Sequence, residues 1–211
     1  MPPTVDGADT TVVAIVLAAG AGSRFSGPTH KLDAAVGGRA LVDRAVGSAL
    51  AAGIGPVVVV TAGQLATALH PSVIHVVNER WAGGQSTSLH AGIDTARRLG
   101  ADAVVVGLAD QPFVTVDAWR AVAATDAAIA VATYGGRRGH PVRLHQSVWD
   151  LLPVEGDEGA RSLMRRQPDL VTAVPCDGSP IDIDTVEDLA RWQSSSSTSS
   201  RSTGRSRRHG R

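Results

Sequence analysis

The sequence predicts a three-layer, Rossmann-like α/β fold, in which helices cover both faces of a mostly parallel β-sheet. Short apolar runs rich in valine alternate with segments of helical periodicity between residues 12 and 133. These runs are apolar at nearly every position, which is typical of strands buried on both faces of a parallel sheet. Ligands of such sheets bind beyond the carboxyl ends of the strands, so we expect the functional residues in the loops that follow the strands.

The elements alternate regularly up to Tyr134. Buried strands are expected at Val12–Leu17, Pro56–Thr61, Val73–Val77, Ala103–Leu108 and Ala127–Thr133. Helices are expected at Leu41–Ala52, at Ser86–Leu99 and from a cap at Thr115 to about Thr125. Residues 135–141 then form a turn-rich segment. The remaining elements are expected to be helices at Ser147–Leu152 and Gly159–Gln167, a strand at Leu170–Val174 and a last helix that starts at a capping box, Thr185-Val-Glu-Asp188.

Composition indicates one folded domain. The chain has 211 residues, of which 43% are hydrophobic, and this is enough for one sizeable core. We expect this domain at residues 12–192, between disordered ends at 1–11 and 193–211. The Ser/Arg-rich C-terminal end holds five of the 20 basic residues and none of the 20 acidic ones, so the remainder has five more acidic than basic residues. A solvated tail is favoured over one that binds nucleic acid.

The sequence also favours a cytoplasmic protein. Cys176 is the only cysteine, so no internal disulfide is expected. The N-terminus lacks the basic and apolar regions of a signal peptide, and no apolar run approaches the roughly 18 residues that span a membrane.

The most informative segment is the loop after the first strand, residues 16–31. Gly20 and Gly22 let backbone N–H groups approach an anion closely, and Arg24 and Lys31 supply fixed positive charges. Neither common phosphate motif fits, because Lys31 is not followed by the Ser or Thr of a P-loop and the dinucleotide fingerprint lacks its third glycine. The loop therefore predicts a site for a triphosphate.

Three aspartates are candidate metal ligands. Asp110 directly follows the strand at Ala103–Leu108, and Asp182 and Asp184 alternate in a short extended stretch. Mg²⁺ prefers one or two carboxylates together with substrate phosphates. Turn formation is the alternative role for Asp110 considered alone. Because alternate residues of an extended segment point to opposite faces, one of Asp182 and Asp184 is expected to reach the metal, with Asp184 favoured.

A third segment, residues 78–89, places Asn78, Ser86 and Ser88 around Gly83-Gly84. The free N–H groups of a helix N-terminus favour an anion or a polar base edge, which predicts a nucleotide contact there. Ordinary helix capping by Ser86 is an equal alternative.

In this order, the segments resemble the MobA-like NTP transferases, and most closely their molybdenum-cofactor cytidylyltransferase (MocA-like) branch. The resemblance covers about residues 12 to 192. Its motifs are the first loop, Asp110-Gln-Pro, Gly139-His-Pro, Gly156-Asp-Glu-Gly-Ala-Arg161 and Asp182-Ile-Asp-Thr. Gln85 stands where these proteins commonly have Met, and Val186 where they have Pro.

The resemblance implies a sheet of the nucleotide-diphospho-sugar transferase type and a role for each motif. It implies that the catalytic residues are Arg24, Lys31 and Asp110. The implied nucleotide-binding residues are Leu17, Ala18, Ala19, Gly20, Gly22, Ser23, Arg24, Lys31, Asn78, Ser86 and Ser88. Gln111, His140, Asp157 and Arg161 would bind the acceptor, although Asp157 and Arg161 alternatively pair with each other. Arg137, Arg138 and His140 together predict an anion-facing cluster.

The implied reaction is a Mg²⁺-dependent transfer of a nucleotidyl group from an NTP to a phosphate-bearing acceptor, with release of pyrophosphate. Ala19 favours CTP by resemblance, and the implied acceptor is molybdopterin or molybdenum cofactor, with a molybdenum oxidoreductase as client. The alternatives are a guanylyl- or sugar-phosphate-type nucleotidyltransferase and a non-catalytic chaperone that carries cofactor to a molybdenum enzyme.

Overall fold

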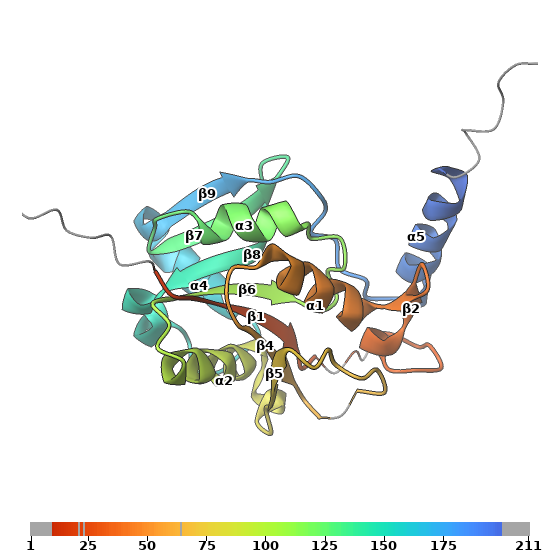
Figure 1. Cartoon of the computed structure of the whole chain (residues 1–211), viewed down its shortest axis with the longest axis horizontal. Coiled ribbons are helices and arrows are strands. Elements are labelled where there is room, and N and C mark those ends of the chain that lie inside the picture. Colours follow the sequence, from red (N-terminus) through yellow and green to blue (C-terminus); the bar gives the residue numbers. More distant parts are fainter. Residues whose placement is uncertain (1–9, 21, 23, 64, 200–211) are drawn as a thin grey trace, which may run out of the picture.

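The computed structural model describes residues 10–20, 22, 24–63 and 65–199. Its centre is a seven-stranded sheet in the order β5-β4-β1-β6-β8-β7-β9 (Figure 1). These strands are β1 (Val12–Ala18), β4 (Val57–Thr61), β5 (Val73–Val77), β6 (Ala103–Leu108), β7 (Ile129–Tyr134), β8 (Arg137–His145) and β9 (Val171–Pro175). A two-stranded ribbon, β2 (Ala35–Val36) and β3 (Arg39–Ala40), precedes the first helix.

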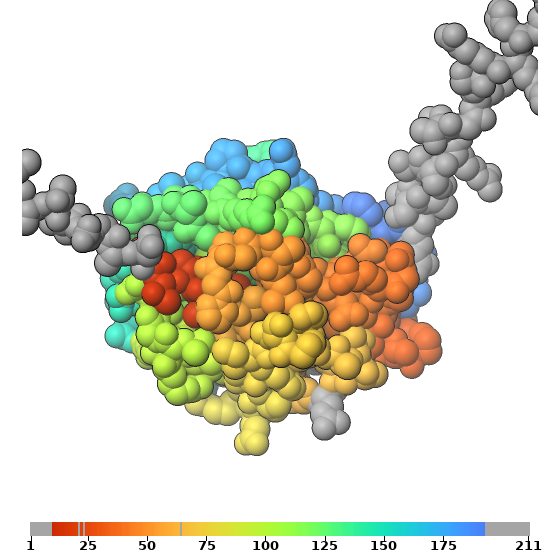
Figure 2. Space-filling model, in the orientation of Figure 1, coloured from red at the N-terminus to blue at the C-terminus, as the bar shows by residue number. Residues whose placement is uncertain are grey.

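Helices cover both faces of this sheet, as predicted. They are α1 (Leu41–Ala52), α2 (Gln85–Arg98), α3 (Val116–Ala123), α4 (Ala160–Arg166) and α5 (Val186–Ser199). The apolar residues of α1 and α3 pack on one face, and those of α2 and α4 pack on the other. The space-filling view shows α1 and α3 side by side over the first of these faces (Figure 2).

β1 shows why a central strand of this sheet can be apolar at every position. Val13, Ile15 and Leu17 belong to the core beneath α2 and α4, whereas Ala14 and Val16 belong to the core beneath α1 and α3. Each of these side chains is at most 7% exposed. The strand therefore has no solvent-facing side, and its loop emerges at the carboxyl edge of the sheet, next to the end of β6.

The prediction for residues 135–141 was wrong in one respect, because the turn there leads directly into a strand. β8 is antiparallel to both β6 and β7 and lies between them. Gly135 and Gly136 form the turn with φ values of 56° and 80°. Val142 and Leu144 are buried in the core beneath α4, so the period-2 signal of this strand was present, masked by the glycines and Pro141 before it. The helix expected at Ser147–Leu152 is a 3-10 helix at Gln146–Leu151.

The last helix starts at the predicted capping box and extends further than expected. The carboxylate of Asp188 accepts from Thr185 N at 3.1 Å, and Asp188 N donates to Thr185 Oγ1 at 3.1 Å. α5 continues to Ser199, beyond residue 192, where we expected the folded domain to end. The division into a folded domain and a disordered tail stays a prediction. Residues 1–9 and 200–211, also expected to be disordered, lie outside the described residues.

The N-terminal end of α5 lies against the rest of the molecule, and the helix extends away from it toward its C-terminal end (Figure 1). Trp192 stacks on Phe113 with ring centroids 4.0 Å apart, next to the buried side chains of Leu41 and Ile183. Among the described helices, none combines the length and apolarity that crossing a membrane requires.

Candidate active site

Two cavities open at the carboxyl edge of the sheet, separated by Leu17 and Gln85, which line both. We call the first the glycine-loop cavity, of about 490 Å³. Its lining includes Ala19, Gly20, Gly22, Arg24, Lys31, Gly84, Ser88, Asp110, Asp157 and Asp184. The second, of about 670 Å³, is the arginine cavity. Its lining includes Val131, Tyr134, Arg137, Arg138, His140, Val142, Arg161, Met164, Arg165, Gln111 and Asp182.

The glycine loop is shaped as the sequence predicts. Gly22 has a φ of 59°, and a Cβ on it would lie 3.1 Å from Lys31 Cβ. A Cβ on Gly20 would meet nothing within 4 Å, so its backbone borders open space. Ala19 lines the cavity, whereas Ala18 packs into the core beneath α1. Ser23, a predicted nucleotide contact, lies outside the described residues.

Lys31 joins two carboxylates from distant parts of the chain. Its Nζ donates to Asp110 Oδ2 at 2.7 Å and to Asp184 Oδ1 at 2.6 Å. Asp110 follows β6, and the 182–184 segment is held beside it by a bond from Ile183 N to Asp110 O at 2.9 Å. The more exposed Arg24 adds a second cation, with Nη1 at 3.1 Å from Asp184 Oδ2. Four predicted site residues thus converge at one point.

The charge of Lys31 is secured by its two partners. Burial alone would lower the pKa of the ammonium group, but the charge and hydrogen bond of Asp110, followed by those of Asp184, outweigh burial and raise this pKa. The side chain is only 9% exposed, so the cation is fixed in place between the carboxylates.

The residues at this point fit a divalent cation. Asp110 Oδ1 is buried and has no hydrogen-bond partner among the described residues, which leaves a free carboxylate oxygen at the cavity. Mg²⁺ or Mn²⁺ takes carboxylate oxygens together with phosphate oxygens and water, so two carboxylates are enough. The described residues contain no cluster of three His, Cys, Asp or Glu side chains arranged to hold a metal.

The structure also separates Asp182 from Asp184, as their alternation predicts. Asp184 contacts Lys31, whereas Asp182 Oδ1 accepts from Gln111 Nε2 at 2.7 Å at the arginine cavity. Burial raises the pKa of Asp182 despite the Gln111 bond, with smaller contributions from Asp110 and Asp184. Metal ligation by Asp110 and Asp184 stays a prediction, and Asp182 lies on the other cavity.

Asn78 and Ser86 are buried and do not line the glycine-loop cavity. Asn78 Nδ2 donates to Thr87 Oγ1 at 2.9 Å and to Ser88 Oγ at 3.0 Å, which ties the end of β5 to the start of α2. Both Asn78 and Ser86 are buried, at 6% and 0% exposed. Ser88 lines the glycine-loop cavity, so of these three residues it is the one placed to meet a ligand.

Gly84 fixes how α2 approaches this cavity. Its φ is 96°, and a Cβ would lie 2.5 Å from the carbonyl carbon of Gly156. Ser86 N donates to Gly156 O at 2.9 Å, so the loop before α4 closes over the start of α2. Asp157 therefore lies at the glycine-loop cavity. It was expected beside Arg161 at the acceptor, but Arg161 lines the other cavity and the described residues show no ion pair between them.

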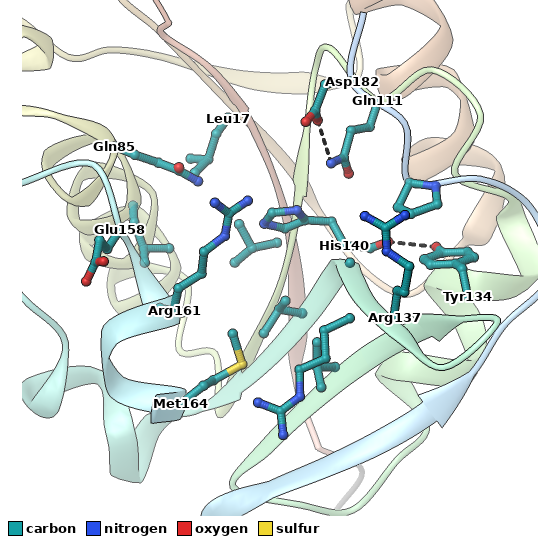
Figure 3. Close-up of a pocket in the computed structure, with 18 of the residues that line it drawn as sticks. Leu17, Gln85, Gln111, Tyr134, Arg137, His140, Glu158, Arg161, Met164 and Asp182 are labelled. Atoms are coloured by element: carbon teal, nitrogen blue, oxygen red, sulfur yellow. Dashed lines mark hydrogen bonds between the residues drawn. The ribbon is translucent and has the colours of Figure 1, made fainter. Parts of the chain in front are cut away.

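The arginine cavity combines an apolar floor with basic side chains (Figure 3). β6, β7 and β8 supply Val106, Val131 and Val142, and α4 supplies Met164. The guanidinium groups of Arg137, Arg138 and Arg161 make no hydrogen bond or ion pair within the described part of the chain, whereas Arg165 Nη2 lies 2.5 Å from Glu158 Oε2. Three cations thus remain available to an anion in this cavity.

His140 lies between Arg161 and Arg137 in this cavity (Figure 3). Burial, together with the positive charge of Arg161, lowers the pKa of its imidazole to about 4. His140 is therefore neutral at pH 7, so the positive charge of the predicted anion-facing cluster comes from Arg137 and Arg138. Its Nδ1 is buried without a hydrogen-bond partner among the described residues, and its carbonyl accepts from Tyr134 Oη at 2.7 Å.

Tyr134, Arg165 and Met164 belong to this cavity and were missed from the sequence as site residues. Met164 and Arg165 lie on α4, and Tyr134 is the last residue of β7. If the pairing of β7 with β8 had been predicted, it would have indicated that Tyr134 lies near His140. No local pattern marks Met164 or Arg165.

The sheet, with one antiparallel strand and a glycine loop after β1, defines the class of protein: the Rossmann-like α/β fold of nucleotidyltransferases. The chain belongs to the MobA-like NTP transferase domain family, whose model matches residues 14–171. This match includes the glycine loop, Asp110, His140 and Arg161, and ends before Asp184.

Two relatives match this sequence. Nicotine blue oxidoreductase of Paenarthrobacter nicotinovorans is 33% identical over 199 residues, which cover 85% of this chain and 95% of that protein. Purine catabolism protein PucB of Bacillus subtilis is 36% identical over 84 residues, which cover 39% of this chain and 41% of PucB.

Solved structures share the fold over nearly their whole length. Rv0371c of Mycobacterium tuberculosis superposes with a TM-score of 0.75 at 26% identity, covering 88% of this chain and 98% of that structure. A nucleotidyl transferase from Methanothermobacter, Mth528, gives 0.73 at 21% identity, covering 90% and 99%, and supports the fold alone. A complex of Rv0371c with manganese gives 0.72 at 25% identity, covering 88% and 100%.

Proposed function

We propose that this protein transfers a nucleotidyl group from an NTP, bound in the glycine-loop cavity, to a phosphate-bearing acceptor in the arginine cavity. In this reaction an acceptor oxygen attacks the α-phosphorus, and the bond to the β-phosphate breaks to release pyrophosphate. The observation that carries the proposal is the meeting of Lys31, Asp110 and Asp184 on the glycine-loop side of Leu17 and Gln85, with three unpaired arginines on the other side among the described residues.

The chain's own residues supply binding and charge stabilisation. Backbone N–H groups at Gly20 and Gly22 would hold the triphosphate, and Arg24 and Lys31 would offset the charge that builds up on the leaving pyrophosphate. Asp110 and Asp184 would hold a divalent cation, which supplies charge neutralisation at the reacting phosphates when bound. An acceptor phosphate is already ionised at pH 7, so no general base is required.

The finer assignment is CTP as donor and molybdopterin or molybdenum cofactor as acceptor, in the MocA-like branch. Ala19 in the loop supports CTP by resemblance. Three guanidinium groups that have no ion-pair partner among the described residues lie beside an apolar floor, which supports an anionic acceptor with an apolar body. We further propose that the reaction takes place in the cytoplasm and that the product passes to a molybdenum oxidoreductase.

A second candidate comes from one relative's name. Nicotine blue oxidoreductase covers most of this chain, which favours testing an oxidoreductase activity. The glycine loop argues against a dinucleotide site of the common type, because Phe25 stands in place of the third glycine.

The experiment that separates these functions is a pyrophosphate-release assay with CTP, GTP, ATP and UTP, with Mg²⁺ or Mn²⁺, with and without molybdopterin cofactor. We expect release with CTP only when acceptor and metal are both present. Release with GTP and a sugar phosphate would change the donor and acceptor, and tight cofactor binding without release would favour a chaperone. A parallel assay follows oxidation of NADH and NADPH, and turnover there alone would overturn the transferase.

Asp110→Asn is expected to lower pyrophosphate release by about 100-fold or more, because a charged ligand of the reacting centre is lost. Asp117→Asn on α3 is the matched control. Asp117 is 91% exposed and, among the described residues, pairs only with Arg120, so this variant should retain wild-type turnover. Near-normal turnover of Asp110→Asn, with an unchanged circular dichroism spectrum, would remove Asp110 from the mechanism.

A further inference from the structure

Lys31 has a second role that its position between two carboxylates indicates. Its ammonium nitrogen lies 2.7 Å from one carboxylate and 2.6 Å from another, and these are the carboxylates that fit a divalent cation. The lysine side chain is 9% exposed and the two carboxylates are 24% and 25% exposed, so water screens this arrangement only in part. A lysine therefore stands where a cation that bridges Asp110 and Asp184 would stand.

The two cations exclude each other at this position. An ammonium group and a divalent ion that share the same two carboxylates would lie within a few ångströms, in a site with little solvent, where like charges repel strongly. Metal binding must then move the Lys31 ammonium away. A metal that arrives alone breaks two short charged hydrogen bonds and leaves a buried ammonium group without an anion.

The nucleotide changes this balance. Lys31 lines the same cavity as Gly20 and Gly22, so phosphates held by the glycine loop would lie within its reach. A lysine displaced by the metal would then exchange carboxylates for phosphates and keep its charge paired. Asp110 Oδ1 makes no hydrogen bond with the described residues, so it is the oxygen of this carboxylate that Lys31 does not engage.

From this geometry we propose that Lys31 is an internal substitute for the divalent cation, which makes metal binding depend on the nucleotide. In the free protein the lysine holds Asp110 and Asp184 in place. When metal and nucleotide bind together, it transfers to the phosphates. Linkage requires the same coupling in both directions, so the metal also tightens the nucleotide. The nucleotide half of this proposal rests on the function proposed above, whereas the competition between lysine and metal does not.

The test measures how tightly Mn²⁺ alone binds to the full chain. Electron paramagnetic resonance reports the concentration of free Mn²⁺ at each point of the titration. Lys31→Met is expected to bind Mn²⁺ about tenfold or more tightly than the wild type without nucleotide, because the competing charge is gone. Lys31→Arg, which keeps the charge, should bind as weakly as the wild type. The double variant Lys31→Met with Asp110→Asn should lose the gain, which assigns the ion to this site.

Equal or weaker Mn²⁺ binding by Lys31→Met would overturn the proposal. Thermal melting provides a second readout, since Mn²⁺ should stabilise Lys31→Met more than the wild type. If Lys31→Met does not fold, Lys31→Gln removes the charge and keeps a hydrogen-bond donor, and the same expectation applies to it.

A non-hydrolysable CTP analogue completes the experiment. It should tighten Mn²⁺ binding to the wild type by a larger factor than to Lys31→Met, and an equal factor would contradict the coupling. This outcome is distinct from failure of the proposed function, which appears as absence of pyrophosphate release. Tighter Mn²⁺ binding by Lys31→Met, together with no pyrophosphate release by the wild-type protein, would support the substitution of lysine for metal and refute the transferase.

Discussion

The glycine-loop cavity and the arginine cavity share Leu17 and Gln85 but differ in how their charges are balanced. In the first, Lys31 and Arg24 are paired with Asp110 and Asp184 within the protein. In the second, three guanidinium groups have no ion-pair partner among the described residues, and the central histidine is neutral. A ligand of the glycine-loop cavity must replace ion pairs that already exist within the protein. An anion in the arginine cavity pairs with guanidinium groups that have no ion-pair partner among the described residues.

This difference indicates which cavity selects which ligand. Competition with internal ion pairs favours a ligand that brings its own cation, such as a metal nucleotide complex. Free arginines beside an apolar floor favour an anion with an apolar body. Three variants in the arginine cavity, given in order of decreasing effect, test this difference between the two cavities.

Arg161→Met is expected to raise the KM for the anionic acceptor about 10- to 100-fold, because a charge-assisted hydrogen bond contributes about 1.5–3 kcal/mol. The KM for the NTP should stay unchanged, since Arg161 does not line the glycine-loop cavity. Arg165→Met is the matched control, because Arg165 is already paired with Glu158 and should have a smaller effect. Steady-state kinetics with each substrate varied in turn would show the split, and an equal change in both KM values would refute it.

His140→Gln is expected to flatten the pH dependence of stability. The imidazole has a pKa of about 4 in the folded protein and about 6.5 when unfolded, so the unfolded state binds more protons between these values and stability falls as the pH falls through this window. Between pH 7 and pH 5 the wild type should lose about 2 kcal/mol more than the variant. Urea unfolding at the two pH values measures this difference.

Parallel losses in wild type and His140→Gln would show that the imidazole is not held neutral by burial. The description of the central histidine as neutral would then be wrong, and a protonated His140 would add to the positive charge of the arginine cavity. Arg161→Met should also reduce the slope, since the charge of Arg161 is the second cause of the lowered His140 pKa.

Tyr134→Phe is expected to have the smallest effect, about 1 kcal/mol of unfolding free energy, because it removes one buried hydrogen bond to the His140 carbonyl. Phe keeps the ring, so the change isolates the hydroxyl group. Binding of Mn²⁺ at the glycine-loop cavity should be unaffected, and a loss there would show that the two cavities are coupled through the sheet.

The core elements of the fold were predictable because their signal is local. The runs at Val57–Thr61 and Ala103–Leu108 are apolar throughout, and the helix at Leu41–Ala52 was located to the residue. β8 was missed because Gly135 and Gly136 precede it and Pro141 interrupts its alternating pattern. Its position in the sheet is set by pairing with β6 on one side and β7 on the other. Helix α5 was predicted to start at Thr185, but its extension to Ser199 runs against composition.

The candidate site divides in the same way. Arg24, Lys31 and Asp110 follow strands, so their convergence could be inferred from the rule that parallel strands share a carboxyl edge. The separation of Asp157 from Arg161 could not, because it depends on how the loop before α4 packs against Gly84. The neutral state of His140 could not either, since it follows from burial next to Arg161.

By itself, the sequence determined the class of fold, the edge of the sheet that carries the chemistry and the residue types there, because apolar runs and glycine loops act over a few neighbouring positions. Tertiary structure alone decided which charges are paired, since Lys31 and Asp184 meet across 153 positions of the chain. Electrostatic energy in a protein depends on distance through space and on exposure to water, and neither quantity is written in the order of the residues.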